Sequence, residues 1–79
     1  MEKLASQIQI GDRIKKQLGI FSDFRVNEIK QCNDGYVAFF GISIDSDRDV
    51  LKVNPNRFIE VLDGDSSYET FINFKNRLK

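Results

Sequence analysis

The sequence predicts a mainly β domain, a small barrel of five strands followed by an amphipathic helix. Short runs of alternating apolar and polar residues recur between residues 8 and 62, with turn residues between them. The only proline, Pro55, stands in a tight corner just before the last run, as in many small barrels. Ser66 and Glu69 then form a capping-box pattern, which indicates the start of a helix.

Residues 8–15 are expected to form a strand, a kink and a second strand. Ile8–Ile10 alternates apolar and polar residues, Gly11 and Asp12 interrupt the alternation, and Arg13–Lys15 resumes it. Residues 17–23 contain Gly19 and are expected to form a loop.

The next two runs are expected to form a hairpin. In residues 24–32, Phe24 and Val26 share one phase and Ile29 has the other, which predicts a bulge at residues 27–28. The segment Asn33-Asp34-Gly35 fits a three-residue hairpin loop in which the glycine takes a left-handed conformation.

Residues 36–44 form the strongest strand pattern. Apolar residues occupy both faces of its first half, which is therefore expected to be buried on both sides. Residues 45–49 are expected to form a polar loop, residues 50–53 a short strand, and residues 58–62 the closing strand after the proline corner.

Residues 66–78 are expected to form an amphipathic helix that completes a single domain of residues 1–79. Its apolar stripe contains Tyr68, Phe71, Ile72, Phe74 and Leu78. Because so short a helix is marginal alone, we expect the stripe to dock on the strands at Val37, Phe39, Phe58 and Leu62. The alternative is that the stripe meets a partner or a second copy.

Two motifs resemble the SH3-like (Src-homology-3-like) small-barrel superfamily. Ile8-Gln9-Ile10-Gly11-Asp12-Arg13-Ile14 is similar to the opening strand of such barrels, and Asn54-Pro55-Asn56-Arg57-Phe58-Ile59-Glu60-Val61 to their one-turn helix and closing strand. The resemblance covers residues 8–62 and implies the same five-stranded barrel. Peptide-binding members carry a groove tryptophan, which this chain lacks, so polyproline binding is not expected.

Composition indicates a small intracellular domain. The 79 residues include one cysteine, Cys32, which excludes an internal disulfide and favours a reducing compartment. The start of the sequence has no signal-peptide pattern, and no apolar run is long enough to span a bilayer. We therefore expect a cytoplasmic protein without a membrane partner, either a monomer or a weak homodimer.

No enzymatic, cofactor or metal site is expected. The chain has no histidine, which removes the commonest general base and metal ligand. The five glycines do not cluster into a phosphate-binding loop. Asp45, Asp47 and Asp49 resemble the opening of a calcium loop, but Val50 and Asn56 replace its glycine and its bidentate glutamate.

The first functional hypothesis is a protein-interaction module. In small barrels the long first loop, the loop of residues 45–49 (the acidic loop) and the proline corner cluster on one side. Loops of this kind commonly carry binding residues. The residues expected to contact the partner are Phe21, Asp23, Phe24, Asp47, Arg48, Asn54 and Arg57.

The alternative hypothesis is a nucleic-acid-binding barrel that uses a basic face on its first two strands. Cations beside aromatic residues can follow a phosphate backbone and stack bases. The residues of this face are Arg13, Lys15, Lys16, Arg25 and Lys30. The formal net charge of zero argues against this role, because phosphate binding usually needs a basic excess.

Overall fold

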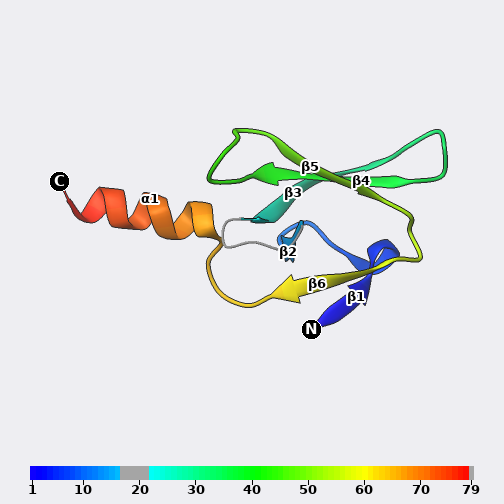
Figure 1. Cartoon of the computed structure of the whole chain (residues 1–79), viewed down its shortest axis with the longest axis horizontal. Coiled ribbons are helices and arrows are strands. Elements are labelled where there is room, and N and C mark those ends of the chain that lie inside the picture. Colours follow the sequence, from blue (N-terminus) through cyan, green and yellow to red (C-terminus); the bar gives the residue numbers. More distant parts are fainter. Residues whose placement is uncertain (17–21, 79) are drawn as a thin grey trace.

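The computed structural model describes residues 1–16 and 22–78. Its strands are β1 (Glu2–Leu4), β2 (Arg13–Lys15), β3 (Asp23–Gln31), β4 (Val37–Ile42), β5 (Asp49–Val53) and β6 (Phe58–Leu62). A short 3-10 helix, η1, spans Ala5–Gln7, and the helix α1 spans Ser67–Arg77. The strands form one antiparallel sheet in the order β1-β6-β2-β3-β4-β5 (Figure 1).

The sheet curves so that its two halves face each other across the core. β3, β4 and β5 make one half, and β1, β2 and β6 make the other (Figure 1). The core between them consists of buried apolar side chains from both halves and from η1: Ala5, Ile8, Ile14, Phe24, Val26, Val37, Phe39, Val53 and Ile59. The predicted mainly β class is confirmed.

The sheet has six strands instead of five, and it is not closed into a barrel. β1 and β5 are its two edges: β1 pairs with β6 alone, and β5 pairs with β4 alone among the described residues. The proline corner reverses the chain between β5 and β6 but does not pair them. The strand at residues 2–4 pairs with the edge of β6 that faces away from β2, and β5 and β6 stay unpaired, so the expected closure is absent.

The first expected strand, Ile8–Ile10, is not a strand. Ile8 is buried in the core, whereas Ile10 is 66% exposed. The Gln9 N–H donates to Asp12 Oδ2 (2.9 Å), and the Asp12 N–H donates to the Gln9 carbonyl (3.1 Å). These bonds close a turn, so the alternation in this segment reflects a turn and not a strand.

The expected hairpin is confirmed. The register between β3 and β4 shifts between Val26 and Glu28, which returns Ile29 to the core side as expected. Gly35 has a φ of 86° and donates its N–H to the Cys32 carbonyl (3.1 Å). This left-handed residue closes the loop between the strands.

The first half of β4 is buried on both sides, as expected. Val37, Ala38 and Phe39 are at most 4% exposed. At Gly41 the backbone of β4 comes so close to β3 that a Cβ atom would overlap the Phe24 ring and the Arg25 carbonyl oxygen. Only glycine fits this position, and its absence of a side chain lets the two strands pack tightly.

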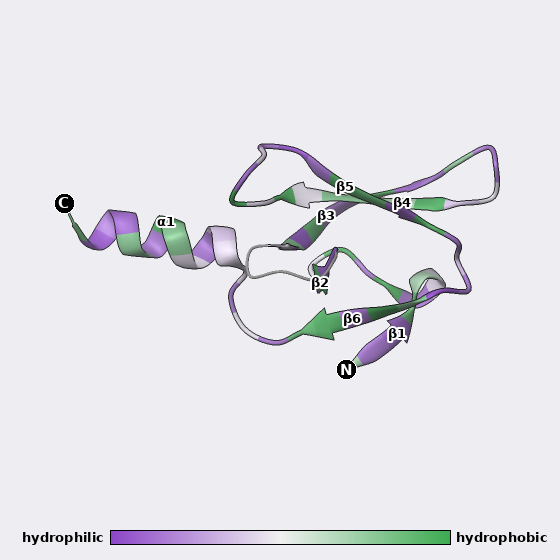
Figure 2. Cartoon of the chain, in the orientation of Figure 1, coloured by the Kyte–Doolittle hydropathy of each residue, from purple (hydrophilic) through white to green (hydrophobic). Residues whose placement is uncertain are grey.

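The helix begins where the capping box predicts but does not dock on the sheet. The Glu69 N–H donates to Ser66 Oγ (3.2 Å), and the Ser66 N–H donates to Glu69 Oε1 (2.7 Å). Val37 and Phe39, expected to receive the helix, instead face the core. None of the described residues of α1 is buried, and the helix projects from the end of the sheet (Figures 1 and 2). No helix in the described part of the chain is long and apolar enough to cross a membrane.

Replacing Gly41 by alanine is expected to destabilise the fold by about 1–3 kcal/mol or more, because the new methyl group overlaps a buried ring and a backbone oxygen. Urea unfolding followed by circular dichroism measures this change. The control is Ile42→Ala, a neighbouring position that is 36% exposed, where we expect a loss below about 1 kcal/mol. Equal unfolding midpoints for the two variants would contradict the close approach of β3 and β4.

Candidate functional site

Three of the residues expected to bind a partner belong to the segment 21–24. Phe21 lies outside the described residues. Asp23 and Phe24 open β3 and are 3% and 0% exposed. The expectation that these two residues lie on an exposed loop is corrected, because β3 already begins at Asp23 and places Phe24 in the core.

The remaining partner-binding residues do not form one surface. Asp47 and Arg48 precede β5, whereas Asn54 and Arg57 follow it (Figure 1). The strand separates the two groups by roughly 16 Å, at about 3.3 Å per residue. Arg48 stacks on the Phe40 ring with its guanidinium carbon 4.4 Å from the centroid. The acidic loop and the proline corner therefore lie at opposite ends of β5.

Three of the five cations expected to bind nucleic acid are held by carboxylates. Arg13 and Arg25 belong to the network described below, and Lys16 is bound by a carboxylate of β5. Lys15 and Lys30 make no ion pair within the described residues; Lys15 is half-buried and Lys30 is exposed. The basic face expected from the sequence is therefore reduced to two separate lysines.

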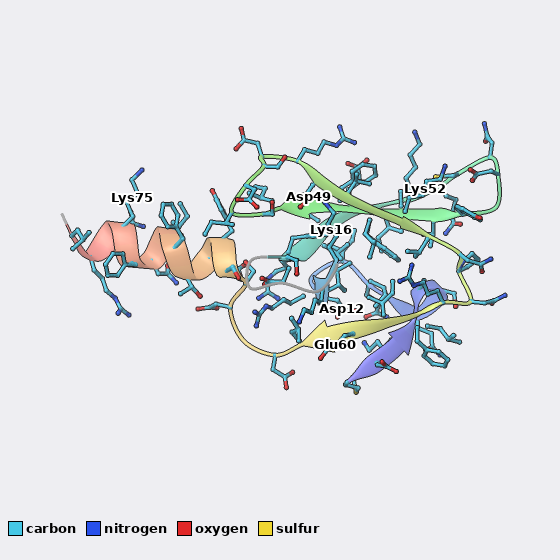
Figure 3. All side chains as sticks on the ribbon, viewed as in Figure 1. Asp12, Lys16, Asp49, Lys52, Glu60 and Lys75 are labelled. Atoms are coloured by element: carbon cyan, nitrogen blue, oxygen red, sulfur yellow. The ribbon has the colours of Figure 1, made fainter. Side chains whose placement is uncertain are left out.

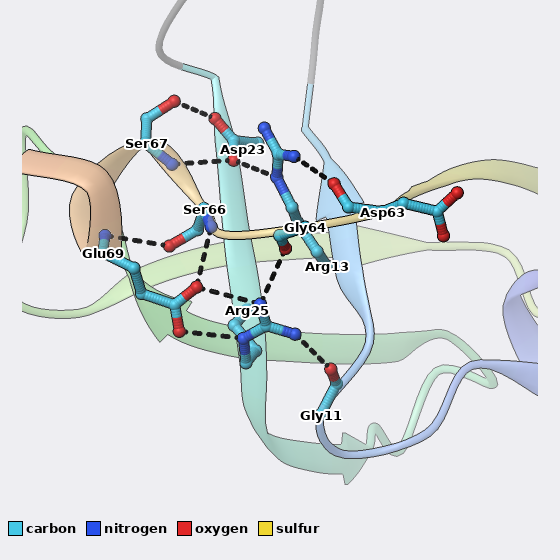
Figure 4. A network of polar contacts seen from close by, with 9 residues as sticks. All are labelled: Gly11, Arg13, Asp23, Arg25, Asp63, Gly64, Ser66, Ser67 and Glu69. Atoms are coloured by element: carbon cyan, nitrogen blue, oxygen red, sulfur yellow. Dashed lines mark hydrogen bonds and ion pairs between the residues drawn. The ribbon is translucent and has the colours of Figure 1, made fainter.

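Arg25 joins three segments that are distant in the sequence. Its Nε and Nη2 donate to the two carboxylate oxygens of Glu69, both at 2.9 Å. Its Nη1 donates to the Gly11 carbonyl (2.7 Å), and its Nη2 also donates to the Gly64 carbonyl (2.9 Å) (Figure 4). One guanidinium thus ties the first turn of α1 to β3 and to the turn before β2.

Asp23 makes a second connection beside the first. Arg13 Nε donates to its Oδ2 (2.7 Å), and the Ser67 N–H donates to the same oxygen (3.1 Å). The Ser67 hydroxyl donates to Oδ1. The other end of the Arg13 guanidinium donates to the Asp63 carbonyl (2.7 Å) (Figure 4). We call the nine residues of Figure 4 the anchoring network: Gly11, Arg13, Asp23, Arg25, Asp63, Gly64, Ser66, Ser67 and Glu69.

The anchoring network stabilises the charged forms of its two carboxylates. The bidentate contact with Arg25 is the main cause that lowers the pKa of Glu69 from 4.5 to about 2, against a smaller opposing effect of burial. Burial alone would raise the pKa of Asp23, but the hydrogen bonds from Ser67 and Arg13 hold it below its usual value of 3.8. The contacts of both carboxylates therefore hold α1 on the sheet most firmly when the carboxylates are ionised.

A cleft of about 390 Å³ lies on the open side of the sheet, between β5 and β6. β6 pairs with β2 only through Val61 and Leu62, and β5 has no second neighbour in the described chain. The cleft is therefore bordered by the unpaired edge of β5. Its lining residues are Lys15, Lys16, Leu51, Val53, Arg57, Phe58, Ile59 and Glu60.

An ion pair closes the cleft opposite the proline corner. Lys16 Nζ, just after β2, lies 2.6 Å from Asp49 Oδ1, at the start of β5 (Figure 3). Burial alone would raise the pKa of Asp49, but the contact with Lys16 and the Val50 N–H hold it below its usual value. This side-chain contact links the residue after β2 to β5, two strands that do not pair with each other in the described chain.

The cleft combines an apolar wall with positive charge. Leu51 is half-buried, and Phe58 is 61% exposed at the rim. Lys15 and Arg57 form no ion pair among residues 1–16 and 22–78, so their charges are available. Glu60 supplies the opposing charge in the lining (Figure 3). The arrangement can bind an apolar group and a carboxylate together.

The described residues contain no group of three or more acidic or cysteine side chains that could hold a metal ion. In the acidic loop, Asp49 is bound by Lys16. Ser46 Oγ accepts a hydrogen bond from the Arg48 N–H (3.3 Å) and donates one to the Arg48 carbonyl (3.0 Å). The expectation of a solvated polar loop fits these local contacts.

The sequence pointed to some of the cleft residues but not to the cleft. Arg57 was expected to bind a protein, and Lys15 and Lys16 to bind nucleic acid, so they belonged to different hypotheses. The sequence predicts Leu51 only as a strand residue, and it predicts Phe58 as part of the surface that receives the helix. The alternation of Leu51 and Val53 with Lys52 marks the side of β5 that faces inward, but nothing in it shows that the facing strand is absent.

No family model matches the chain, and no curated protein or solved structure matches it.

Acid is expected to destabilise the anchoring network. The pKa values of Glu69 and Asp23 are lower in the folded chain than their ordinary values, so their stabilising effect is complete above about pH 5 and is lost towards about pH 2. Melting temperatures measured by circular dichroism should therefore fall across this range. In Glu69→Gln, which removes one titrating group, the fall should be smaller.

The control for this experiment is Asp47→Asn, because that exposed carboxylate makes no ion pair in the described part of the chain. The control should keep the pH dependence of the unmodified protein. If Glu69→Gln behaves like Asp47→Asn, the Arg25–Glu69 contact does not contribute to stability as described.

Proposed function

We propose that this chain is a non-enzymatic protein-interaction module that binds an extended segment of a partner in the cleft between β5 and β6. The observation that supports this most directly is the unpaired edge of β5 beside an apolar wall. An exposed strand edge offers backbone N–H and C=O groups to any extended chain. Addition of a strand to such an edge is a common mode of peptide recognition.

The part of β5 best suited to this pairing is Leu51–Val53. The Val50 N–H already donates to Asp49 Oδ1 (2.9 Å), so the start of the strand is capped. In a segment paired further along, alternate side chains would point into the cleft, towards Leu51 and Phe58. The backbone then supplies affinity, and the cleft supplies selectivity for apolar side chains.

Charge indicates the chemistry of the partner segment. Lys15 and Arg57 have no carboxylate partner among the described residues, and Arg57 stands at the exposed rim. A guanidinium binds a carboxylate with two parallel hydrogen bonds. We therefore infer a segment that alternates apolar and acidic residues. A nucleic-acid backbone is less suitable, because Arg13, Arg25 and Lys16 are already engaged.

Two further interpretations remain predictions. The SH3-like resemblance of residues 8–62 is one; without a tryptophan, it does not extend to polyproline binding. The cytoplasmic location is the other, and it depends mainly on the single cysteine, Cys32.

The proposal predicts that random peptides displayed on phage and selected on the full chain converge on extended sequences with acidic and apolar residues. The selected peptide should perturb the amide NMR signals of residues 51–53 and 57–60. Its affinity should fall about tenfold or more in the double variant Arg57→Ala, Phe58→Ala, which removes a cation and an exposed aromatic ring from the rim.

The matched control is Arg48→Ala, which removes an exposed cation outside the cleft and should leave the affinity unchanged. Signals that shift elsewhere, or equal loss in the control, would overturn the proposed site. Salt-sensitive binding of single-stranded RNA that falls with Lys15→Glu and Lys30→Glu would support the nucleic-acid alternative instead.

A further inference from the structure

The apolar stripe of α1 is not covered by the rest of the described chain. Phe71, Phe74 and Leu78 are 47%, 61% and 73% exposed. Tyr68 and Ile72 are half-buried, and no described residue of the helix is buried. Figure 2 shows hydrophobic bands along a helix that projects from the sheet.

Only the first turn of α1 is held in place. Ser66, Ser67 and Glu69 belong to the anchoring network. Beyond Glu69, the described residues of α1 make no side-chain hydrogen bond or ion pair with the sheet. A helix of 11 residues is marginal in water, and most helical stability in proteins comes from packing of the apolar face. A surface that covers this face would therefore stabilise the last two turns.

Charge along the helix indicates what this surface is. Asp63 and Asp65 are exposed just before the helix, whereas Lys75 and Arg77 lie in its last turn. Two such helices side by side in antiparallel orientation place the acidic end of each against the basic end of the other. This orientation also opposes the two helix dipoles favourably.

The spacing of the residues supports a specific antiparallel register. With Phe71 on the two-fold axis, Tyr68 comes level with Phe74 of the second helix, and Asp65 comes level with Arg77. A shallow groove of about 200 Å³ runs beside Phe74 and is lined by Asp65, Thr70, Asn73, Phe74 and Arg77. Because Thr70, Asn73 and Arg77 follow the polar side of the helix, this groove flanks the apolar stripe at Phe74.

We propose that α1 is a self-association surface, which docks antiparallel on α1 of a second copy of this chain with Phe71 and Phe74 at the centre. The contact is isologous, so one set of residues satisfies both copies. Two helices of about three turns bury less than the roughly 1,200 Å² typical of stable complexes. We therefore expect a weak dimer, with a dissociation constant in the micromolar range.

An anionic membrane is a poorer match for the same face. Lys75 and Arg77 would be attracted to it, but Asp63 and Asp65 would be repelled at the other end of the helix. A flat surface of one charge cannot satisfy both ends, whereas an antiparallel second copy does.

Sedimentation velocity of the full chain, from about 5 to about 500 µM, tests the proposal. We expect a shift from monomer to dimer with concentration, accompanied by increased helicity. Phe74→Glu changes an exposed residue and should keep the chain folded but monomeric, with at least tenfold weaker association. Phe58→Glu, at an exposed phenylalanine of the cleft, is the matched control and should dimerise normally.

Charge reversal tests the register. Asp65→Arg and Arg77→Asp should each weaken the dimer about three- to tenfold, because each change places like charges at both ends of the helix pair. The double variant should return to within about twofold of the unmodified protein. A monomer at every concentration, or a double variant weaker than both single variants, would overturn the proposal. Binding to vesicles with phosphatidylserine by a chain that stays monomeric would assign the stripe to a membrane surface instead.

Discussion

The pairing of Arg25 with Glu69, beside that of Arg13 with Asp23, is the interaction that fixes the helix to the sheet. It places the start of α1 at the ends of β2 and β3 and so determines the direction in which the helix leaves the sheet. This anchoring lies at the first turn, and no described residue of α1 is buried. The same contacts engage two arginines that would otherwise have formed a basic surface.

The second constraint is the open side of the sheet. β1 extends the outer edge of β6, and within the described residues β5 has a single neighbour, so the curved sheet has no continuous hydrogen bonding between β5 and β6. The proline corner and the Lys16–Asp49 contact connect the halves instead. A gap bounded by a strand edge and apolar side chains is a natural place for an extended segment of another protein.

The two proposed surfaces are separate. α1 projects from the end of the body opposite the proline corner, and the cleft is bordered by that corner (Figure 1). A dimer formed through α1 would leave both clefts accessible. Two weak peptide sites in one dimer bind a partner that carries two segments more tightly than either site alone, because the second contact becomes intramolecular.

Local patterns in the sequence determined the elements that depend on near neighbours. Residues 33–35 specify the hairpin loop, residues 27–28 the bulge, and Ser66 with Glu69 the start of the helix, because each signal acts over a few residues. The three-residue strand β1 and the turn at residues 8–12 were missed, since such short segments take their conformation from their partners.

Only the tertiary structure decided which faces are covered and which charges are available. The stripe of α1 looks the same in the sequence whether it packs on the sheet or projects into solvent, and its direction depends on Arg25 and Glu69, 44 residues apart. The cleft likewise depends on the edge of β5 that no other described strand pairs with. Chain topology creates both surfaces, and no local periodicity encodes it.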